Sequence, residues 1–397
     1  MAEEQIVSDR KQVLVALTAW DFNSSAGVLK GLHRYLLTHP SLQAHFCMLE
    51  PGIVSDVRLA QRLVARFRPD GVLAHVFWRR CDLRLEAGVP LVSLDDIRPP
   101  EYPTVMSDQE RAGRLVAEHL LEQGIAHYAF AASSNRHYYA NLRWRGFRDR
   151  LRQAERTCHR LELSTQTLSG DPVSDDELCD WVAGLPKPVG VHAVHMGLAV
   201  RLEWACAERG LNVPEEVAVV GGHELTDLAT NGSPPVTAID PDRPRQGYEA
   251  MRLLDRLMHG AKAPEAPLLI PPVGIIRRQS SDVRGMRDPE VASLRRLIRE
   301  RAHQPLIVKE LLDRTPLSRR VLERRFQKHL GHSLHDEIVL ARMERAQRLL
   351  RETVMPVTKV AALSGYANYA VFSVAFLKHT GLRALEYRRR SLPADGM

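Results

Sequence analysis

From residue 11 to about residue 281, short apolar runs alternate with longer amphipathic stretches. The apolar runs predict strands over residues 13–17, 71–76, 90–94, 128–132, 190–194 and 217–221. The amphipathic stretches predict helices over residues 26–37, 57–67, 112–123, 142–153, 198–209 and 248–259, followed by an extended segment over 268–276. Continuous apolar strands separated by helices indicate parallel sheets covered on both faces, so we expect an α/β fold.

The pattern changes to all-helical after residue 288, and residues 357–379 have the layout of a helix-turn-helix unit. A short apolar helix is stopped by Gly365, and Asn368 is placed to cap the helix that follows. Phe372 and Phe376 are one turn apart, so they predict the buried side of this second helix.

A second copy of this layout lies about 50 residues earlier. Residues 309–312 form its first helix, residues 313–316 its turn, and Ser318 its cap, while Leu322 and Phe326 face inward. Two such units suit two adjacent insertions into the DNA major groove, joined by a long helix over residues 336–352. A generic helical bundle is the bland alternative.

Several spaced segments of this region resemble the DNA-binding domain of AraC/XylS-type transcription regulators. They are FQKHLG at 326–331, AALSGY at 361–366, FLKHTG at 376–381 and EYR at 386–388. The resemblance spans about a hundred residues and implies an all-α domain with two helix-turn-helix units over residues 289–390.

The N-terminal region resembles the ligand-binding domain of LacI-type repressors, itself similar to periplasmic sugar-binding proteins. The segments that carry the resemblance are VMSD at 105–108, EHL at 118–120, VVG at 219–221, TAIDP at 237–241 and GYEA at 247–250. It implies a two-lobed effector-binding and dimerisation domain over residues 11–281, with residues 282–288 as a linker. A LacI-like body followed by an AraC-type tail is the arrangement of xylose-operon activators.

Charge and cysteine content agree with this division. The chain of 397 residues has a net charge of +7, and residues 286–390 hold 22 Lys and Arg against 11 Asp and Glu. A basic tail beside a body of about −4 indicates a nucleic-acid partner, although a solvated helix face is the alternative for residues 295–301. Five cysteines without a CxxC pair argue against disulfides and zinc and favour the cytoplasm. The start of the chain has no signal or membrane helix, so we expect no membrane partner.

Residues that follow the predicted strands are candidates for effector binding, because ligands of such folds bind at the carboxyl ends of the strands. They are Trp20, Asp21, Asn23, Trp78, Asn141, Arg143, Met196, His223 and Glu224. Aromatic faces beside Asp, Asn and Arg suit a polyhydroxylated ligand, although any one of them is as readily a bystander. The resemblance assigns a ligand contact to Arg143. Met196 and the pair His223 and Glu224 replace an aspartate and a polar pair that are usual in the family, which argues against a simple transfer of xylose.

The outward positions of the two second helices are candidates for DNA contact. Arg320 and Arg324 suit guanine and Glu323 suits cytosine, whereas Tyr369, Ala370 and Val374 offer only weak specificity to the second unit. Backbone contacts are expected from Ser318, Arg319, Arg325, Lys359, Asn368 and Lys378.

The sequence therefore predicts a DNA-binding transcription regulator controlled by a small sugar-like effector, a pentose being one candidate. Activation, with RNA polymerase as partner, and a homodimer are implied by the resemblance. No cofactor is expected, and His192 and His195 lack the third ligand that a metal site needs. One alternative is a body that has lost its ligand and serves only as a dimerisation scaffold. A sugar-acting enzyme is more remote, because GxGxxG, P-loop and GxSxG motifs are absent.

Overall fold

The structure, a computed structural model, divides the chain into two compact units, Met1–Asp282 and Val283–Met397. It describes residues 10–18, 22–49, 54–75, 85–94, 96–132, 137–161, 175–223, 229–230, 232, 234–283, 288–304 and 306–391. Each unit has hydrophobic clusters of its own. None of the helices in these ranges has the length and apolar character that crossing a bilayer requires.

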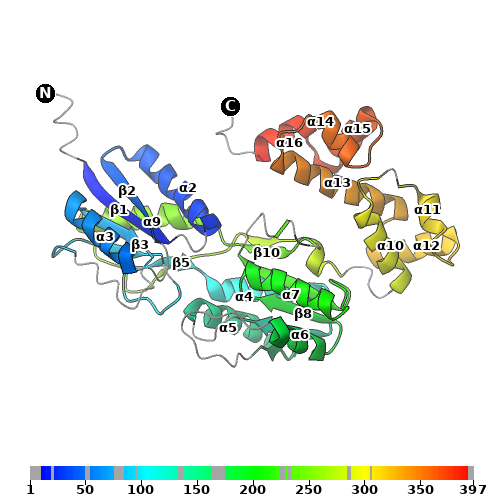
Figure 1. Cartoon of the computed structure of the whole chain (residues 1–397), viewed down its shortest axis with the longest axis horizontal. Helices are drawn as coiled ribbons and strands as arrows, with labels where there is room; N and C mark the ends of the chain where they lie inside the picture. The colour runs from blue at the N-terminus through cyan, green and yellow to red at the C-terminus, as the bar shows by residue number, and fades with distance from the viewer. Residues whose placement is uncertain are drawn as a thin grey trace. The chain divides into compact units, whose positions relative to one another are not determined.

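The first lobe of the N-terminal unit is a parallel sheet in the order β2-β1-β3-β4 (Figure 1). Its strands are β1 (Lys11–Thr18), β2 (Leu42–Leu49), β3 (Gly71–Ala74) and β4 (Leu91–Ser93), and its helices are α2 (Phe22–Thr38), α3 (Val54–Phe67) and α9 (Arg243–Met258). Alternation along β1 explains the layers. Val13 and Val15 pack against α2 and α9, whereas Leu14 and Ala16 face the cluster that α3 completes through Val64.

The second lobe is a six-stranded sheet in the order β12-β10-β9-β8-β6-β7, parallel except at β12. Its strands are β6 (His127–Ala131), β7 (His159–Arg160), β8 (Val189–Ala193), β9 (Val217–His223), β10 (Thr237–Asp240) and β12 (Gly274–Ile276). Its helices are α4 (Gln109–Glu122), α5 (Tyr138–Gln153), α6 (Asp175–Gly184) and α7 (Met196–Glu208). The central strands β8 and β9 are buried almost throughout, as strands covered on both faces must be.

The chain passes between the two lobes three times. It leaves the first lobe after β5 (Val105–Ser107), returns after β10, and crosses again between β11 (Leu268–Ile270) and β12. β5 and β11 pair in parallel at these passages. The first residues of α4 and α9 therefore lie at the junction of the lobes.

The C-terminal unit consists of seven helices within the described residues (Figure 1). They are α10 (Pro289–Glu300), α11 (Val308–Leu312), α12 (Arg319–Leu330), α13 (Leu334–Glu352), α14 (Val357–Leu363), α15 (Tyr369–Thr380) and α16 (Ala384–Ser391). The pairs α11–α12 and α14–α15 are the two helix-turn-helix units, and α13 joins them. The predicted caps are present: the Ser318 side chain accepts from Val321 N at 3.4 Å, and Asn368 Oδ1 accepts from Ala370 N at 2.7 Å.

Each half of this unit packs around its own cluster. Leu322 and Phe326 are fully buried in the first half, and Phe372 and Phe376 are fully buried in the second, as their spacing predicted. The first cluster adjoins a buried charge group, in which Glu337 Oε1 accepts from Arg295 Nε at 3.0 Å. Arg295 lies in the range 295–301, for which a solvated helix face was the alternative. It is an interior residue.

The predicted fold class is confirmed, an α/β body with parallel sheets followed by an all-α tail. The sequence missed the strands β2, β5, β7 and β10 and the helix α6. It also joined residues 268–276 into one extended segment, whereas β11 and β12 belong to different sheets. Three of the missed strands, β5, β7 and β10, have only two to four residues and carry little periodicity of their own. Strand β2 has eight residues, so its length does not explain why it was missed.

Candidate functional site

Arg143 is the centre of the candidate effector site, and the packing of α4 against α5 holds it in place. A Cβ at Gly113 would lie 2.0 Å from the carbonyl oxygen of Arg143, and a Cβ at Gly146 would lie 1.9 Å from that of Glu110. Only glycine at both positions lets the two helix backbones come this close. Arg143 is therefore fully buried beside the start of α4.

The guanidinium of Arg143 is hydrogen-bonded entirely to neutral groups. Its Nε donates to Gln109 Oε1 at 3.0 Å, its Nη2 donates to the same oxygen, and its Nη1 donates to the carbonyl of Val194. Gln109 Nε2 in turn donates to Asp96 Oδ2 at 2.6 Å, which fixes the amide with its oxygen toward the arginine. Burial lowers the pKa of Arg143 to about 10, and the nearby Tyr139 and Asp96 oppose that shift.

His223, the last residue of β9, joins Arg143 to Arg243. Its Nε2 lies 2.8 Å from Arg143 Nη2, and its Nδ1 lies 2.6 Å from Arg243 Nη2. Arg243 is the first residue of α9 in the first lobe, whereas His223 and Arg143 belong to the second. The three side chains thus form a contact across the junction of the lobes.

Polar groups of the junction orient Arg243. Its Nη1 donates to Gln246 Oε1 at 2.6 Å and lies 3.5 Å from Ser107 Oγ. Gln246 Nε2 donates to the carbonyl of Val105 at 2.9 Å, so this amide too presents its oxygen to an arginine. Both arginines are therefore held by amide side chains whose orientation is set by a second acceptor.

The histidines of β8 and α7 have structural roles. His192 is fully buried, lies edge-on to Phe130, and donates from Nδ1 to the carbonyl of Val220 at 3.2 Å. Burial and the charge of Arg143 lower its pKa to about 3. His195 caps α7, because its Nδ1 accepts from Leu198 N at 3.0 Å. No group of three metal-ligating side chains occurs in the described part of the chain.

The other predicted effector residues divide into three groups. Asn141 is exposed, and its side chain accepts a hydrogen bond from Arg160 Nη2 at 3.2 Å. It lies outside the site because Asn141 and Arg143, two residues apart on a helix, do not share a face. Met196 is buried against Gly221 and provides no strong acceptor. Trp20, Asp21, Trp78 and Glu224 lie outside the described residues, as does the side chain of Asn23.

Sequence reasoning missed Gln109 and Arg243, although both follow segments that it had singled out. Gln109 comes directly after VMSD at 105–108, and Arg243 follows TAIDP at 237–241. These segments mark passages of the chain between the lobes. The signal was therefore their position at the junction.

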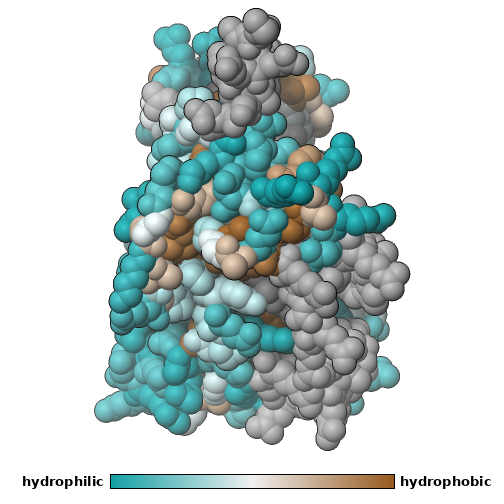
Figure 2. Space-filling model, turned by 90° about the vertical axis from the view of Figure 1, so that its left-hand side faces the viewer, coloured by the Kyte–Doolittle hydropathy of each residue, from teal (hydrophilic) through white to brown (hydrophobic). Residues whose placement is uncertain are grey.

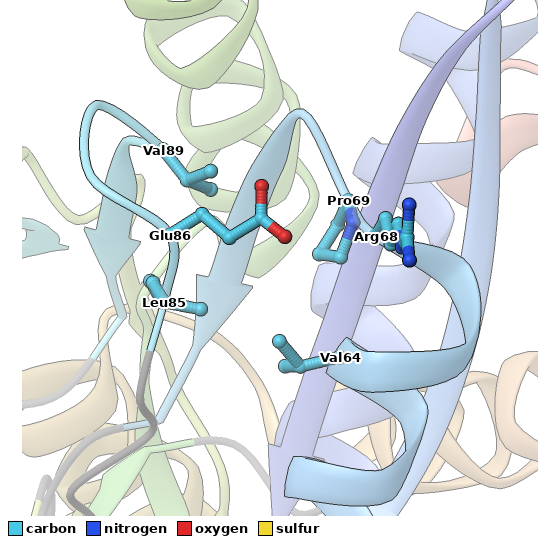
Figure 3. A pocket seen from close by; sticks show the side chains of 6 residues that line it. All are labelled: Val64, Arg68, Pro69, Leu85, Glu86 and Val89. Atoms are coloured by element: carbon cyan, nitrogen blue, oxygen red, sulfur yellow. The ribbon is translucent and has the colours of Figure 1, made fainter.

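A separate small hollow lies in the first lobe, away from this site (Figure 3). It is lined by Val64, Arg68, Pro69, Leu85, Glu86 and Val89. Its volume of about 20 Å³ holds roughly one water molecule. A sugar-sized ligand does not fit there.

The outward face of α12 carries the arginines predicted to contact DNA. Arg319, Arg320 and Arg324 are exposed. Two of the residues predicted to contact DNA also have partners inside the domain. Glu323 Oε2 accepts from Leu334 N at 3.2 Å, at the start of α13. Arg325 Nη1 donates to both carboxylate oxygens of Asp288 at 3.1 Å, so its contact to phosphate requires this ion pair to open.

The outward face of α15 is apolar. Tyr369 is 46% exposed, Val371 58%, Val374 69% and Leu377 44%, and Ala370 is exposed as well. Lys359 and Lys378 are exposed beside them. This helix offers methyl and aromatic groups where α12 offers guanidinium groups.

Comparison with known proteins finds both parts of this architecture. Residues 117–281 match the family described as periplasmic binding protein-like domain, and residues 311–390 match a helix-turn-helix domain family. The xylose operon regulatory protein of Escherichia coli is 27% identical over 375 residues, 91% of this chain and 93% of that protein. In both parts and in their order along the chain, this protein is similar to the xylose operon regulatory proteins.

Two further similarities support this conclusion. The xylose operon regulatory protein of Haemophilus influenzae is 28% identical over 293 residues, 73% of this chain and 75% of that protein. A solved structure described as the xylose-binding transcription activator XylR superposes with a TM-score of 0.73 at 23% identity, covering 97% of this chain and all of that one. The chain is thus a DNA-binding transcription regulator with an effector-binding domain in front of its DNA-binding domain.

Proposed function

We propose that this regulator activates a sugar-utilisation operon when a small sugar-like effector binds at the junction of the two lobes. The observation that carries the proposal is the contact of His223, from the second lobe, with Arg243, from the first. A ligand at that contact touches both lobes, so its binding favours one arrangement of them over another. The names of the similar proteins favour a sugar, with a pentose as first candidate, and a transcription activator. RNA polymerase is the partner that activation implies.

We propose domain limits of 11–281 for the effector domain, 282–288 for the linker and 289–390 for the DNA-binding domain. The first limit is supported by Ser280, a buried residue whose hydroxyl donates to the carbonyl of Val219 at 2.6 Å. The last is supported by Asp288, whose side chain caps α10 through Glu290 N at 3.2 Å.

A homodimer formed through the effector domain is part of the proposal. Strand β2 is at the edge of its sheet, and Phe46 and Met48 near its end are 51% and 39% exposed. Figure 2 shows apolar side chains exposed among hydrophilic ones on the side of the molecule that carries this lobe. Exposed apolar groups of this kind mark association surfaces. Dimers place two tails on paired half-sites, and effector binding changes which spacing they span.

Base contacts are proposed for Arg320 and Arg324, which are exposed one turn apart on α12. Backbone contacts are proposed for Arg319, Lys359 and Lys378. Because its proposed binding partner is chromosomal DNA, we place the protein in the cytoplasm. The similar proteins are transcription regulators, which favours binding without catalysis.

The experiment that tests this function is selection of DNA sites by the full-length protein, followed by titration of a selected site. Arg320→Ala and Arg324→Ala are each expected to cost about 1–3 kcal/mol of DNA binding free energy, the value of one good bidentate base contact. Lys328→Ala, also exposed on α12, is the matched control. Equal affinity of all variants for the selected site contradicts the assignment of base contacts to Arg320 and Arg324.

Titration of the same site with D-xylose, L-arabinose, D-ribose, D-glucose, their acids and their phosphates tests the effector. One compound of this panel is expected to change DNA affinity. If none does while binding still depends on Arg320, the body is a dimerisation scaffold, the alternative that the apolar Met196 favours.

A further inference from the structure

The hydrogen-bonding groups around His223 do not balance. Both of its ring nitrogens contact guanidinium nitrogens, Nε2 that of Arg143 at 2.8 Å and Nδ1 that of Arg243 at 2.6 Å. A neutral imidazole has one donor and one acceptor, and a guanidinium has donors only. One of the two contacts therefore brings two N–H donors together, whichever tautomer His223 adopts.

Protonation does not relieve this conflict, because an imidazolium donates from both nitrogens. Burial, followed by the charges of Arg243, Arg143 and His192, holds the pKa of His223 well below its usual value. The ring therefore stays neutral between the two cations. Relief has to come from an added acceptor.

The surroundings of Arg143 reinforce the shortage of acceptors. Its hydrogen-bond acceptors are an amide, a backbone carbonyl and the histidine ring, and Asp96 acts on it only from behind Gln109. Arg143 is fully buried, and a buried cation paired with neutral groups alone is costly. Met196, buried at the start of α7, contributes no charge of opposite sign.

We propose that the effector is an anionic sugar derivative whose carboxylate or phosphate group binds between Arg143, His223 and Arg243. Such a group only accepts hydrogen bonds, so it takes N–H from both guanidiniums and from the imidazole at once. A sugar hydroxyl accepts too, but it also brings a hydrogen of its own into a site already crowded with donors. The inference rests on the proposed function and specifies the chemical class of its effector.

Calorimetric titration of the full-length protein with matched pairs tests the charge. D-Glucuronate is compared with D-glucose, D-galacturonate with D-galactose, D-xylonate with D-xylose, and D-ribose 5-phosphate with D-ribose. At least one anion is expected to bind about ten-fold or more tightly than its neutral partner. A carboxylate effector is distinguished from a phosphate effector by which pair shows the difference, and acetate and inorganic phosphate control for charge alone.

Variants at the start of α9 locate the anion. Arg243→Gln keeps the aliphatic stem that packs on Gly27 and removes the charge, and it is expected to weaken binding of the anion at least ten-fold. Arg243→Lys is expected to restore part of that affinity. Arg245→Gln removes an equal charge from an exposed position two residues on, and it is expected to leave the affinity within about two-fold. Arg243 is only half-buried, so its replacement tests the site without the folding risk of Arg143→Gln.

The two levels of the proposal fail differently. A neutral sugar that binds as tightly as its anionic partner and changes DNA affinity overturns the anionic effector while the sugar-responsive function stands. An anion whose affinity is equal in Arg243→Gln and in the unchanged protein overturns the assigned site. If no compound of either kind binds or changes DNA affinity, the sensing function itself is overturned, and this inference with it.

Discussion

Helices α12 and α15 are each twelve residues long, begin at a capped N-terminus and end at a glycine of positive φ. Their buried faces also correspond, with Leu322 and Phe326 in one and Phe372 and Phe376 in the other. Their outer faces share one feature, an exposed lysine in the last turn, Lys328 in α12 and Lys378 in α15. Otherwise they differ: α12 exposes arginines, whereas α15 exposes Val371, Val374 and Leu377. The frame of a helix-turn-helix unit and the chemistry that it presents are thus set by separate residues.

The difference extends to the cores of the two halves. The first is aliphatic around Phe326 and adjoins the buried pair of Arg295 and Glu337. The second is aromatic, with ring centroids of Phe372 and Phe376 5.4 Å apart and those of Phe376 and Tyr387 also 5.4 Å apart. One frame can be filled in two ways, because close packing constrains volume and shape more than residue type.

The largest expected effect tests whether the two frames are equivalent. Phe326→Ala and Phe376→Ala are each expected to lower the free energy of unfolding by about 3–5 kcal/mol, because each leaves a cavity in a fully buried site. Far-ultraviolet circular dichroism follows the loss of helix during denaturation. All five tryptophans precede residue 282, so tryptophan fluorescence reports the N-terminal unit separately and should not change. A large loss in only one variant means that the halves are not equivalent.

The next effect tests whether the outer faces differ in function. Arg320→Ala is expected to cost about 1–3 kcal/mol of binding free energy on a selected site. Val374→Ala, at an exposed position of α15, is expected to cost less, because the valine offers a methyl contact and not a bidentate hydrogen bond. Titration of the same labelled DNA by fluorescence anisotropy measures both. Equal losses would remove the distinction between a specifying first unit and a positioning second unit.

The caps offer a smaller and symmetric test. Ser318→Ala and Asn368→Ala are each expected to destabilise their helix by about 1 kcal/mol. The Asn368 hydrogen bond of 2.7 Å is shorter than the 3.4 Å of Ser318, so the asparagine replacement should cost at least as much. Chemical denaturation followed by circular dichroism measures the change, and Ser318→Asn serves as a control that retains a cap. If Ser318→Ala lowers the stability more than Asn368→Ala does, the contribution of a cap does not follow the length of its hydrogen bond.

The smallest effect concerns the apolar face of α15. Replacing thymine by uracil in the part of the selected DNA that α15 contacts removes methyl groups. This change is expected to reduce the binding free energy by less than about 1 kcal/mol. The same replacement in the part of the DNA that the arginines of α12 contact should leave the affinity unchanged. Competition titrations against unmodified DNA resolve such differences. If the affinity falls only when thymine is replaced in the part of the DNA that α12 contacts, the assigned roles of the two helices are reversed.

Much of the frame followed from local sequence. Ser318, Asn368, Gly365 and the paired inward residues of each unit specify helix starts, stops and buried faces through contacts within a few residues. The long apolar runs of the N-terminal unit likewise identified its central parallel strands. The short strands β5 and β10 were missed, because pairing across the sheet, which a single segment does not reveal, defines them.

The effector site divides in the same way. The sequence placed Arg143 and His223 at strand and helix ends, but it also selected Asn141, which points away to Arg160. It assigned Arg325 to DNA, although Asp288, 37 residues earlier, is its partner in the fold. Each of these outcomes depends on which side chains come together across elements, and periodicity carries no information on that.

The sequence by itself determined the two-part architecture, the central strands of the sheets, the helix caps and the arginine-rich face, because these depend on near neighbours along the chain. Only the tertiary structure decided that Gln109, Arg143, His223 and Arg243 meet. They come from four elements in two lobes, and glycines at the α4–α5 contact let the backbones approach closely enough. The excess of donors around His223 appears only once those distant residues share one small buried volume, where water no longer supplies the missing acceptors.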